Sequence, residues 1–175
     1  LGSFPATNNN FLGMPGMHGN FTAVTAMQES DLLITLGARF DDRVTGKLDE
    51  FAISAKIIHV DIDPAELGKV RRPDIPRQGD CRVAIETMVK VLRESNPEVT
   101  DRSAWKSRIS GWQERFPLVY ESSNPGQALK PQFVIEKLRD ATPADTIVAS
   151  GVGQHQMWAS QYWTFDHPYT WINSG

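Results

Sequence analysis

Four short segments of this 175-residue sequence carry residues whose types and spacing could serve chemistry. The first is Gly16-Met17-His18-Gly19, which precedes a predicted helix. Glycine lacks a Cβ atom, so this backbone could come close to the polar chain of a bound cofactor. An ordinary glycine turn explains the same pattern, and the residues alone leave both interpretations open.

The second segment, residues 37–43, places two arginines and two aspartates in one loop after an apolar stretch. The guanidinium groups of Arg39 and Arg43 suit phosphate or carboxylate oxygens, so the loop is a candidate ligand site. The carboxylates of Asp41 and Asp42 equally favour a solvated loop that is held by salt bridges.

The third segment is centred on Asp61, which ends a second apolar stretch. An acidic side chain at this place commonly accepts hydrogen bonds from ribose hydroxyls. The alternative is a cap on the following turn, formed together with Asp63. The Gly-x-Gly-x-x-Gly fingerprint is absent from the sequence, which weakens the case for a standard nicotinamide-binding domain.

The fourth segment, GVGQHQMW at residues 151–158, combines two glycines, an imidazole, two amides and a thioether. His155 could donate a hydrogen bond to an anionic intermediate, or it could be a core histidine. His18, His59 and His167 have no spacing typical of a metal site, and no Ser/His/Asp or Cys/His order favours a hydrolase.

All four segments occupy positions where an open parallel sheet presents loops and helix N-termini to ligands. Short apolar runs predict strands buried on both faces, and apolar residues at helical spacing predict helices. Residues 39–47 and 71–76 are predicted as loops. The predicted strands are 31–36, 56–63, 145–150 and 169–172, and the predicted helices are 20–28, 82–94, 102–116, 154–162 and one that starts at residue 131.

The predicted fold class is therefore α/β, with a parallel-sheet nucleotide-binding domain followed by the start of a second α/β domain. Turn-forming residues at 121–127 favour a linker there. We expect a first domain at residues 1–120, a linker at 121–130 and the beginning of a second domain at 131–175. The chain starts without methionine and stops just after a predicted strand, so we expect an internal piece of a larger enzyme.

Charge and composition exclude several classes of protein. The formal net charge of −3 gives no attraction to phosphate backbones or anionic membranes, so neither nucleic acid nor membrane is an expected partner. The single cysteine, Cys81, cannot form an internal disulfide or a multi-cysteine metal site. No apolar run approaches the roughly 20 residues that cross a bilayer. The expected location is cytoplasmic.

Four motifs taken together resemble the acetolactate synthase (acetohydroxyacid synthase) family, large catalytic subunit. They are GMPGMHG at 13–19, GARFDDRVTGK at 37–47, HVDIDPAE at 59–66 and GVGQHQMW at 151–158, in matching order and spacing. The resemblance implies a three-domain thiamine diphosphate enzyme. This chain would supply most of the central flavin-binding domain, without its N-terminal part, and the truncated beginning of the C-terminal thiamine-diphosphate-binding domain.

The family decarboxylates pyruvate and condenses it with a second 2-oxo acid, pyruvate or 2-oxobutyrate, in branched-chain amino-acid biosynthesis. The resemblance implies thiamine diphosphate as the electron sink, Mg²⁺, and flavin adenine dinucleotide (FAD) in a largely structural role. It also implies a homodimer or tetramer of catalytic subunits, a small regulatory subunit and, for a plant protein, a location in the plastid stroma.

The resemblance also implies which residues form the sites. Val152, Gln154 and His155 would face thiamine diphosphate, and Met17, Asp42 and Arg43 would line the channel for substrates and herbicidal inhibitors. The flavin would contact Pro15, Gly16, Met17, His18, Gly37, Ala38, Arg39, Asp41, Arg43, Asp61, Ile62, Asp80, Cys81, Gln156, Met157, Ser174 and Gly175.

The sequence departs from the family at two positions, because Pro15 stands where leucine is expected and Cys81 where valine is expected. The activating glutamate belongs to the N-terminal domain, and the magnesium ligands are expected beyond Gly175, so the chain alone should be inactive. The alternatives are a flavin-containing thiamine enzyme of the glyoxylate carboligase or pyruvate oxidase type, or a non-catalytic nucleotide-binding module. The strings at 39–43 and 154–158 favour acetolactate synthase over the two other thiamine enzymes. The incomplete second domain after the linker argues against a self-contained module, which would not need it.

Overall fold

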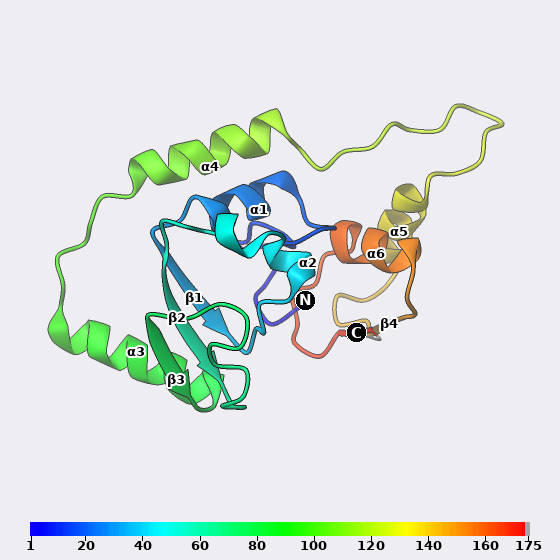
Figure 1. Ribbon diagram of the computed structural model, residues 1–175. Coiled ribbons are helices and arrows are strands. Elements are labelled where there is room, and N and C mark those ends of the chain that lie inside the picture. The colour runs from blue at the N-terminus through cyan, green and yellow to red at the C-terminus, as the bar shows by residue number, and fades with distance from the viewer. Residues whose placement is uncertain (174–175) are drawn as a thin grey trace. The chain divides into compact units, whose positions relative to one another are not determined.

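A computed structural model describes residues 1–173 and shows an α/β fold with parallel sheets, which confirms the predicted fold class (Figure 1). The chain forms two compact units. The split unit comprises residues 1–23 together with residues from 114 onward, and the inserted unit comprises residues 24–113. The predicted domains at 1–120 and 131–175, with a linker at 121–130, stay a prediction.

The inserted unit is built on a parallel sheet in the order β1-β2-β3, with strands Leu32–Leu36, Lys56–Asp61 and Ile75–Gln78. Strand β3 corrects the sequence prediction, which assigned residues 71–76 to a loop. Its Pro76 lacks an N–H group, and a strand at the edge of a sheet tolerates this loss because one of its sides has no ladder. All three strands end at the same edge of the sheet.

The core of the inserted unit lies on one face of this sheet. Phe40, Phe51, Ala52, Ala55 and Ile57 form a buried cluster, with Met27 and Leu33 packed against it. Leu32 and Ile34 of β1 remain 46% and 47% exposed, so the prediction that this strand is buried on both faces is wrong. Alternate side chains of a strand point to opposite faces, and the side chains that alternate with Leu33 point away from this cluster.

The inserted unit also contains helices. Helix α2 (Asp42–Thr45) lies within residues 39–47, which were predicted as a polar loop, because a four-residue helix carries too little periodicity to be recognised. The 3₁₀ turn Leu48–Glu50 follows directly after this segment. Helix α3 (Cys81–Ser95) runs alongside the strands (Figure 1). Helices α1 (Phe21–Gln28) and α4 (Ser103–Arg115) each cross a unit boundary along the chain.

The split unit contains a second, two-stranded parallel sheet of β4 (Val148–Ser150) and β5 (Trp171–Asn173). Helix α5 (Pro131–Asp140) contacts α6 (Gln154–Tyr162), and the Arg139 Nε–H donates to the Thr164 carbonyl oxygen at 3.1 Å. Phe165 is buried here, with its ring against that of Trp171. Across residues 1–173, every helix is too short or too polar to cross a membrane.

Candidate functional site

Three sequence-predicted segments meet at the carboxyl edge of the β1-β2-β3 sheet. The Gly37 N–H donates to the Val60 carbonyl oxygen at 2.8 Å, and the Gly79 N–H donates to the Asp61 carbonyl oxygen at 2.9 Å. A Cβ atom placed on Gly37 would lie 3.7 Å from the Cys81 sulfur. The parallel register therefore brings together the ends of three strands that are far apart in the sequence, and the contribution of residue 79 was not foreseen.

Asp61 lies at the centre of this edge and is only 8% exposed. Its Oδ1 atom accepts a hydrogen bond from the Asp63 N–H at 2.9 Å. The side chain of Asp63 caps in turn the Ala65 N–H at 2.9 Å. The capping role considered for Asp61 from the sequence is therefore present, and a ribose contact stays a prediction that this bond does not exclude.

The loop at residues 37–43 is held by its own polar groups. Asp41 caps α2 by accepting from the Arg43 N–H at 2.8 Å, and its other oxygen lies 3.4 Å from an Arg39 guanidinium nitrogen. The Arg39 side chain is 69% exposed. Such an exposed pair stabilises the fold by about 1 kcal/mol at most, so the guanidinium stays available to an anionic ligand.

Helix α3 starts at the same edge, where Asp80 caps it. The Asp80 Oδ1 atom accepts from the N–H groups of Arg82 at 2.8 Å and Val83 at 3.2 Å. This carboxylate already occupies the position that an anion would take at the helix N-terminus. The carboxylate oxygens of Asp80 can still accept hydrogen bonds from ligand hydroxyl groups, whereas their negative charge disfavours a phosphate. Cys81 follows as a half-buried free thiol.

The glycine-rich segment at residues 13–19 lies in the split unit and forms a tight turn. The Gly19 N–H donates to the Gly16 carbonyl oxygen at 2.9 Å, and the Asn20 N–H donates to the Met14 carbonyl oxygen at 3.0 Å. The Asn20 side chain donates to the Leu12 carbonyl oxygen at 2.8 Å and also caps α1. Asn20 was not singled out from the sequence, although an asparagine before a helix is a familiar capping signal.

Helix α6 binds this glycine-rich turn directly. The Gln161 side chain donates to the His18 carbonyl oxygen at 2.6 Å, so two predicted cofactor segments adjoin within the split unit. Met17 is 66% exposed, and His18 is exposed as well. No pattern in the sequence could have indicated Gln161, because its partner is 143 residues away.

The start of α6 presents the residues predicted to face thiamine diphosphate. Val152, Gln154 and His155 are exposed, whereas Gln156 and Met157 are half-buried. Gly153 has φ +151°, and a Cβ atom at this position would lie 3.0 Å from the His155 ring. The predicted flavin contacts Ser174 and Gly175 lie outside the described residues.

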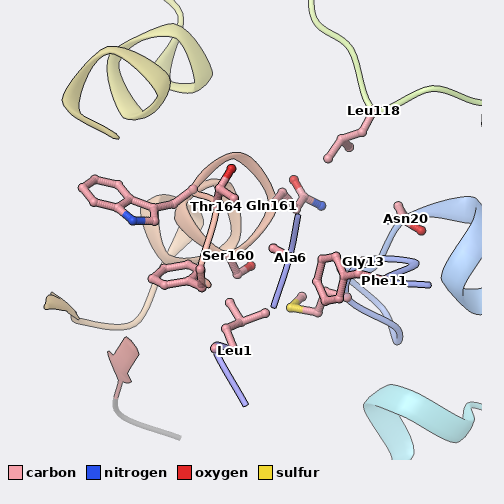
Figure 2. Close-up of a pocket in the computed structure, with 13 residues that line it drawn as sticks. Leu1, Ala6, Phe11, Gly13, Asn20, Leu118, Ser160, Gln161 and Thr164 are labelled. Carbon is pink, nitrogen blue, oxygen red and sulfur yellow. The ribbon is translucent and has the colours of Figure 1, made fainter. Parts of the chain in front are cut away.

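A pocket of about 220 Å³ opens in the split unit between the N-terminal segment and the end of α6 (Figure 2). Gly13, Asn20 and Ser160 line it, whereas Met17 and His18 do not. The amide of Asn20 is already bonded, and the Ser160 hydroxyl donates to the Met157 carbonyl oxygen at 2.8 Å. These polar groups are satisfied internally, so they give the pocket little means of selecting a polar ligand.

Two further features of residues 1–173 concern titratable groups. No three His, Cys, Asp or Glu side chains in this range are arranged to hold a metal ion. The Tyr120 hydroxyl donates to the Glu136 carboxylate, and this hydrogen bond raises the pKa of Tyr120 to about 12. That bond ties the segment after α4 to α5.

Comparisons with known proteins agree on one family. The protein-family model described as "Thiamine pyrophosphate enzyme, central domain" matches residues 1–88. The acetolactate synthase large subunit of Corynebacterium glutamicum is 50% identical over 175 residues, covering 100% of this chain and 28% of the relative. The acetolactate synthase of Mycobacterium leprae is 50% identical over 178 residues, covering 99% of this chain and 28% of the relative.

A plant relative is also similar. Chloroplastic acetolactate synthase 1 of Oryza sativa subsp. japonica is 43% identical over 175 residues, covering 99% of this chain and 27% of the relative. The chain thus spans about 28% of the length of the first curated relatives that it matches.

Proposed function

Because the chain belongs to the family of thiamine pyrophosphate enzymes, we propose that it forms part of the large catalytic subunit of an acetolactate synthase. The observation that carries this proposal is the 50% identity to the Corynebacterium glutamicum acetolactate synthase large subunit over all 175 residues, since this span includes all four motifs. The relatives reported above are named acetolactate synthases, which argues against a glyoxylate carboligase, a pyruvate oxidase or a non-catalytic module.

The proposed reaction is the decarboxylation of pyruvate and its condensation with pyruvate or 2-oxobutyrate, in branched-chain amino-acid biosynthesis. Thiamine diphosphate supplies the electron sink for the decarboxylation when it is bound. The exposed Gln154 and His155 would hold that cofactor's reacting end, together with Val152. His155 can donate a hydrogen bond to an anionic group there, which is the role we assign to it.

The carboxyl edge of the β1-β2-β3 sheet fits one end of a flavin dinucleotide. A Cβ atom on Gly79 would meet nothing within 4 Å, so the backbone is open to a ligand. Asp61 and Asp80 offer carboxylate acceptors for ribose hydroxyls, with Ile62 and Cys81 beside them. Arg39 and Arg43 offer donors to a diphosphate, next to Gly37, Ala38 and Asp41.

The split unit would supply the remaining flavin contacts and part of the substrate channel. Residues 15–18 and the half-buried Gln156 and Met157 would contact the flavin. The exposed Met17 would also line the channel for substrates and herbicidal inhibitors, together with Asp42 and Arg43 of the inserted unit. Magnesium ligands are expected beyond Gly175.

The proposal extends to assembly and location. Catalytic subunits would form a homodimer or tetramer, with a small regulatory subunit as a further partner. Homologues from bacteria and chloroplasts are consistent with a cytoplasmic location or with the plastid stroma.

The deciding experiment uses the purified protein that carries this chain, loaded with thiamine diphosphate, Mg²⁺ and FAD. We expect acetolactate to form from pyruvate and bound flavin to persist through gel filtration. Formation of hydrogen peroxide from pyruvate would indicate a pyruvate oxidase instead. Consumption of glyoxylate without acetolactate formation would indicate a glyoxylate carboligase.

Asp61→Ala is expected to weaken flavin retention, because it removes a carboxylate at the centre of the proposed site. Flavin absorbance per polypeptide after gel filtration measures the effect. Asp63→Ala is the matched control. It removes the carboxylate that caps the Ala65 N–H in the same turn, but Asp63 lies beyond the end of β2. Equal flavin loss in both variants would show that only the turn matters.

His155→Ala is expected to lower turnover more than flavin content, because its ring is assigned to the thiamine side of the site. Steady-state acetolactate formation and flavin absorbance are compared in the same preparation. A parallel loss of both would assign His155 a structural role.

A further inference from the structure

One buried side chain anchors the loop at residues 37–43. Phe40 is 6% exposed, while none of the other residues in this loop is buried. Its φ of +52° lies in the left-handed region, which an aromatic residue adopts only where its surroundings hold it there. Something specific must therefore stabilise Phe40 in this conformation.

The ring of Phe40 packs against His59 in the middle of β2. The two rings meet edge to face, with centroids 5.1 Å apart and an interplanar angle of 88°. The rings of Phe51 and Phe40 also meet edge to face, with centroids 6.0 Å apart and an interplanar angle of 76°. Phe40 thus closes the buried cluster from the loop side.

His59 is fully buried, and neither of its ring nitrogens has a hydrogen-bond partner among the described residues. An imidazole buried without polar partners is costly, because its N–H group loses water and gains nothing in exchange. The His59 ring instead packs edge to face against Phe40. The ring of His59 therefore acts as an aromatic surface.

We infer that Phe40, whose ring packs against His59, is a positioning residue. It holds the loop at residues 37–43 in the conformation in which Arg39 and Asp41 face the flavin. These two residues flank Phe40 directly, and Asp41 in turn fixes the start of α2 through the Arg43 N–H. A shift of the ring would therefore move both arginines together. This inference rests on the proposed flavin site.

The test compares two Phe→Leu variants of the same cluster in the complete enzyme. Phe40→Leu and Phe51→Leu should both lower the thermal unfolding temperature, since each removes a ring from the core. Only Phe40→Leu should weaken FAD, by roughly tenfold in dissociation constant, because misplaced contact groups lose affinity without being deleted. FAD titration of the apoprotein measures the affinity, and visible circular dichroism reports the surroundings of the bound flavin.

Two variants of His59 provide an independent check. His59→Phe keeps an aromatic surface and should leave FAD affinity within about twofold of the wild type. His59→Ala removes the ring against which Phe40 packs, so it should weaken FAD binding as Phe40→Leu does.

Unchanged FAD affinity in a folded Phe40→Leu variant would overturn the inference alone, as would equal weakening by Phe51→Leu. A folded wild-type enzyme that binds no FAD would overturn the proposed flavin site, and this inference with it.

Discussion

At the scale of single residues, two positions of the glycine-rich segment have no room for a side chain. A Cβ atom on Gly13 would lie 1.9 Å from the Asn20 side-chain nitrogen, and one on Gly19 would lie 2.3 Å from the Met14 carbonyl oxygen. Real Cβ atoms do not approach other atoms so closely. The turn interpretation of this segment therefore has a physical basis that does not depend on any ligand.

Gly19→Ala is expected to destabilise the protein by about 2 kcal/mol, because the new methyl group meets backbone that cannot move independently. Denaturant unfolding measures the change. Gly111→Ala is the control: a Cβ atom there would meet nothing within 4 Å, and alanine favours the interior of α4 by about 1 kcal/mol. Destabilisation by both changes would contradict the steric account.

The carboxylates show what a sequence leaves undecided at this scale. Asp61 was identified because an acidic residue at the end of an apolar run often contacts a ribose, whereas Asp41 and Asp80 were named as flavin contacts from the family resemblance. All three also bond to backbone N–H groups within three residues of themselves. Whether such a bond forms depends on the φ and ψ angles of the following residues, which composition does not determine.

At the scale of elements, the strands and helices with strong periodicity were predicted well. Strands β1 and β2, together with helices α3, α4 and α6, lie within two residues of their predicted bounds. Strand β3 was missed because Pro73 and Pro76 break its pattern. It forms nevertheless because β2 offers an open edge for pairing.

The convergence at the sheet edge could also be predicted, since parallel strands end on one side of their sheet. The contact of α6 with the glycine-rich turn could not be predicted. It depends on packing between segments that only the folded chain brings together.

Asp80→Ala is expected to destabilise α3 by about 1 kcal/mol, because two N–H groups lose their acceptor. Asp80→Ser is the matched control, since serine supplies an oxygen at the same position and should retain most of the stability. Urea unfolding of both variants measures the difference. Equal losses would show that charge rather than capping stabilises the helix.

The bond between Tyr120 and Glu136 should show in a pH titration. It raises the pKa of Tyr120 from the ordinary value of 10.0 to about 12. The stabilisation is therefore fully present below pH 10 and is lost as the pH rises through about 12. We expect Glu136→Gln to lower this pKa towards its ordinary value. Phenolate absorbance, taken as the difference from Tyr120→Phe in each background, measures it, and an unchanged pKa would contradict the assignment.

At the scale of the whole molecule, much apolar surface remains open. Leu32, Ile34 and Leu36 project from one face of β1 and are all more than a third exposed. Contiguous apolar patches of this kind promote association. The net charge of −3 offers little repulsion against it.

A polypeptide of these 175 residues alone is therefore expected to self-associate and to bind a hydrophobic dye. Replacing Leu32 and Ile34 together with lysine should reduce both effects, because it adds two charges to the exposed face. Sedimentation velocity and dye fluorescence measure the change. The same double change at the exposed Val91 and Leu92 of α3 serves as the comparison, and a larger reduction there would assign the association to the helix instead.

The split unit has a consequence for synthesis on the ribosome. Residues 24–113 are continuous, so the inserted unit can fold as soon as its own chain has left the exit tunnel. The first 23 residues must wait for α6, because the carbonyl oxygen of His18 meets Gln161 only after well over a hundred further residues have been translated. At about 5–20 residues per second this delay lasts many seconds, during which residues 1–23 would be open to chaperones and proteases.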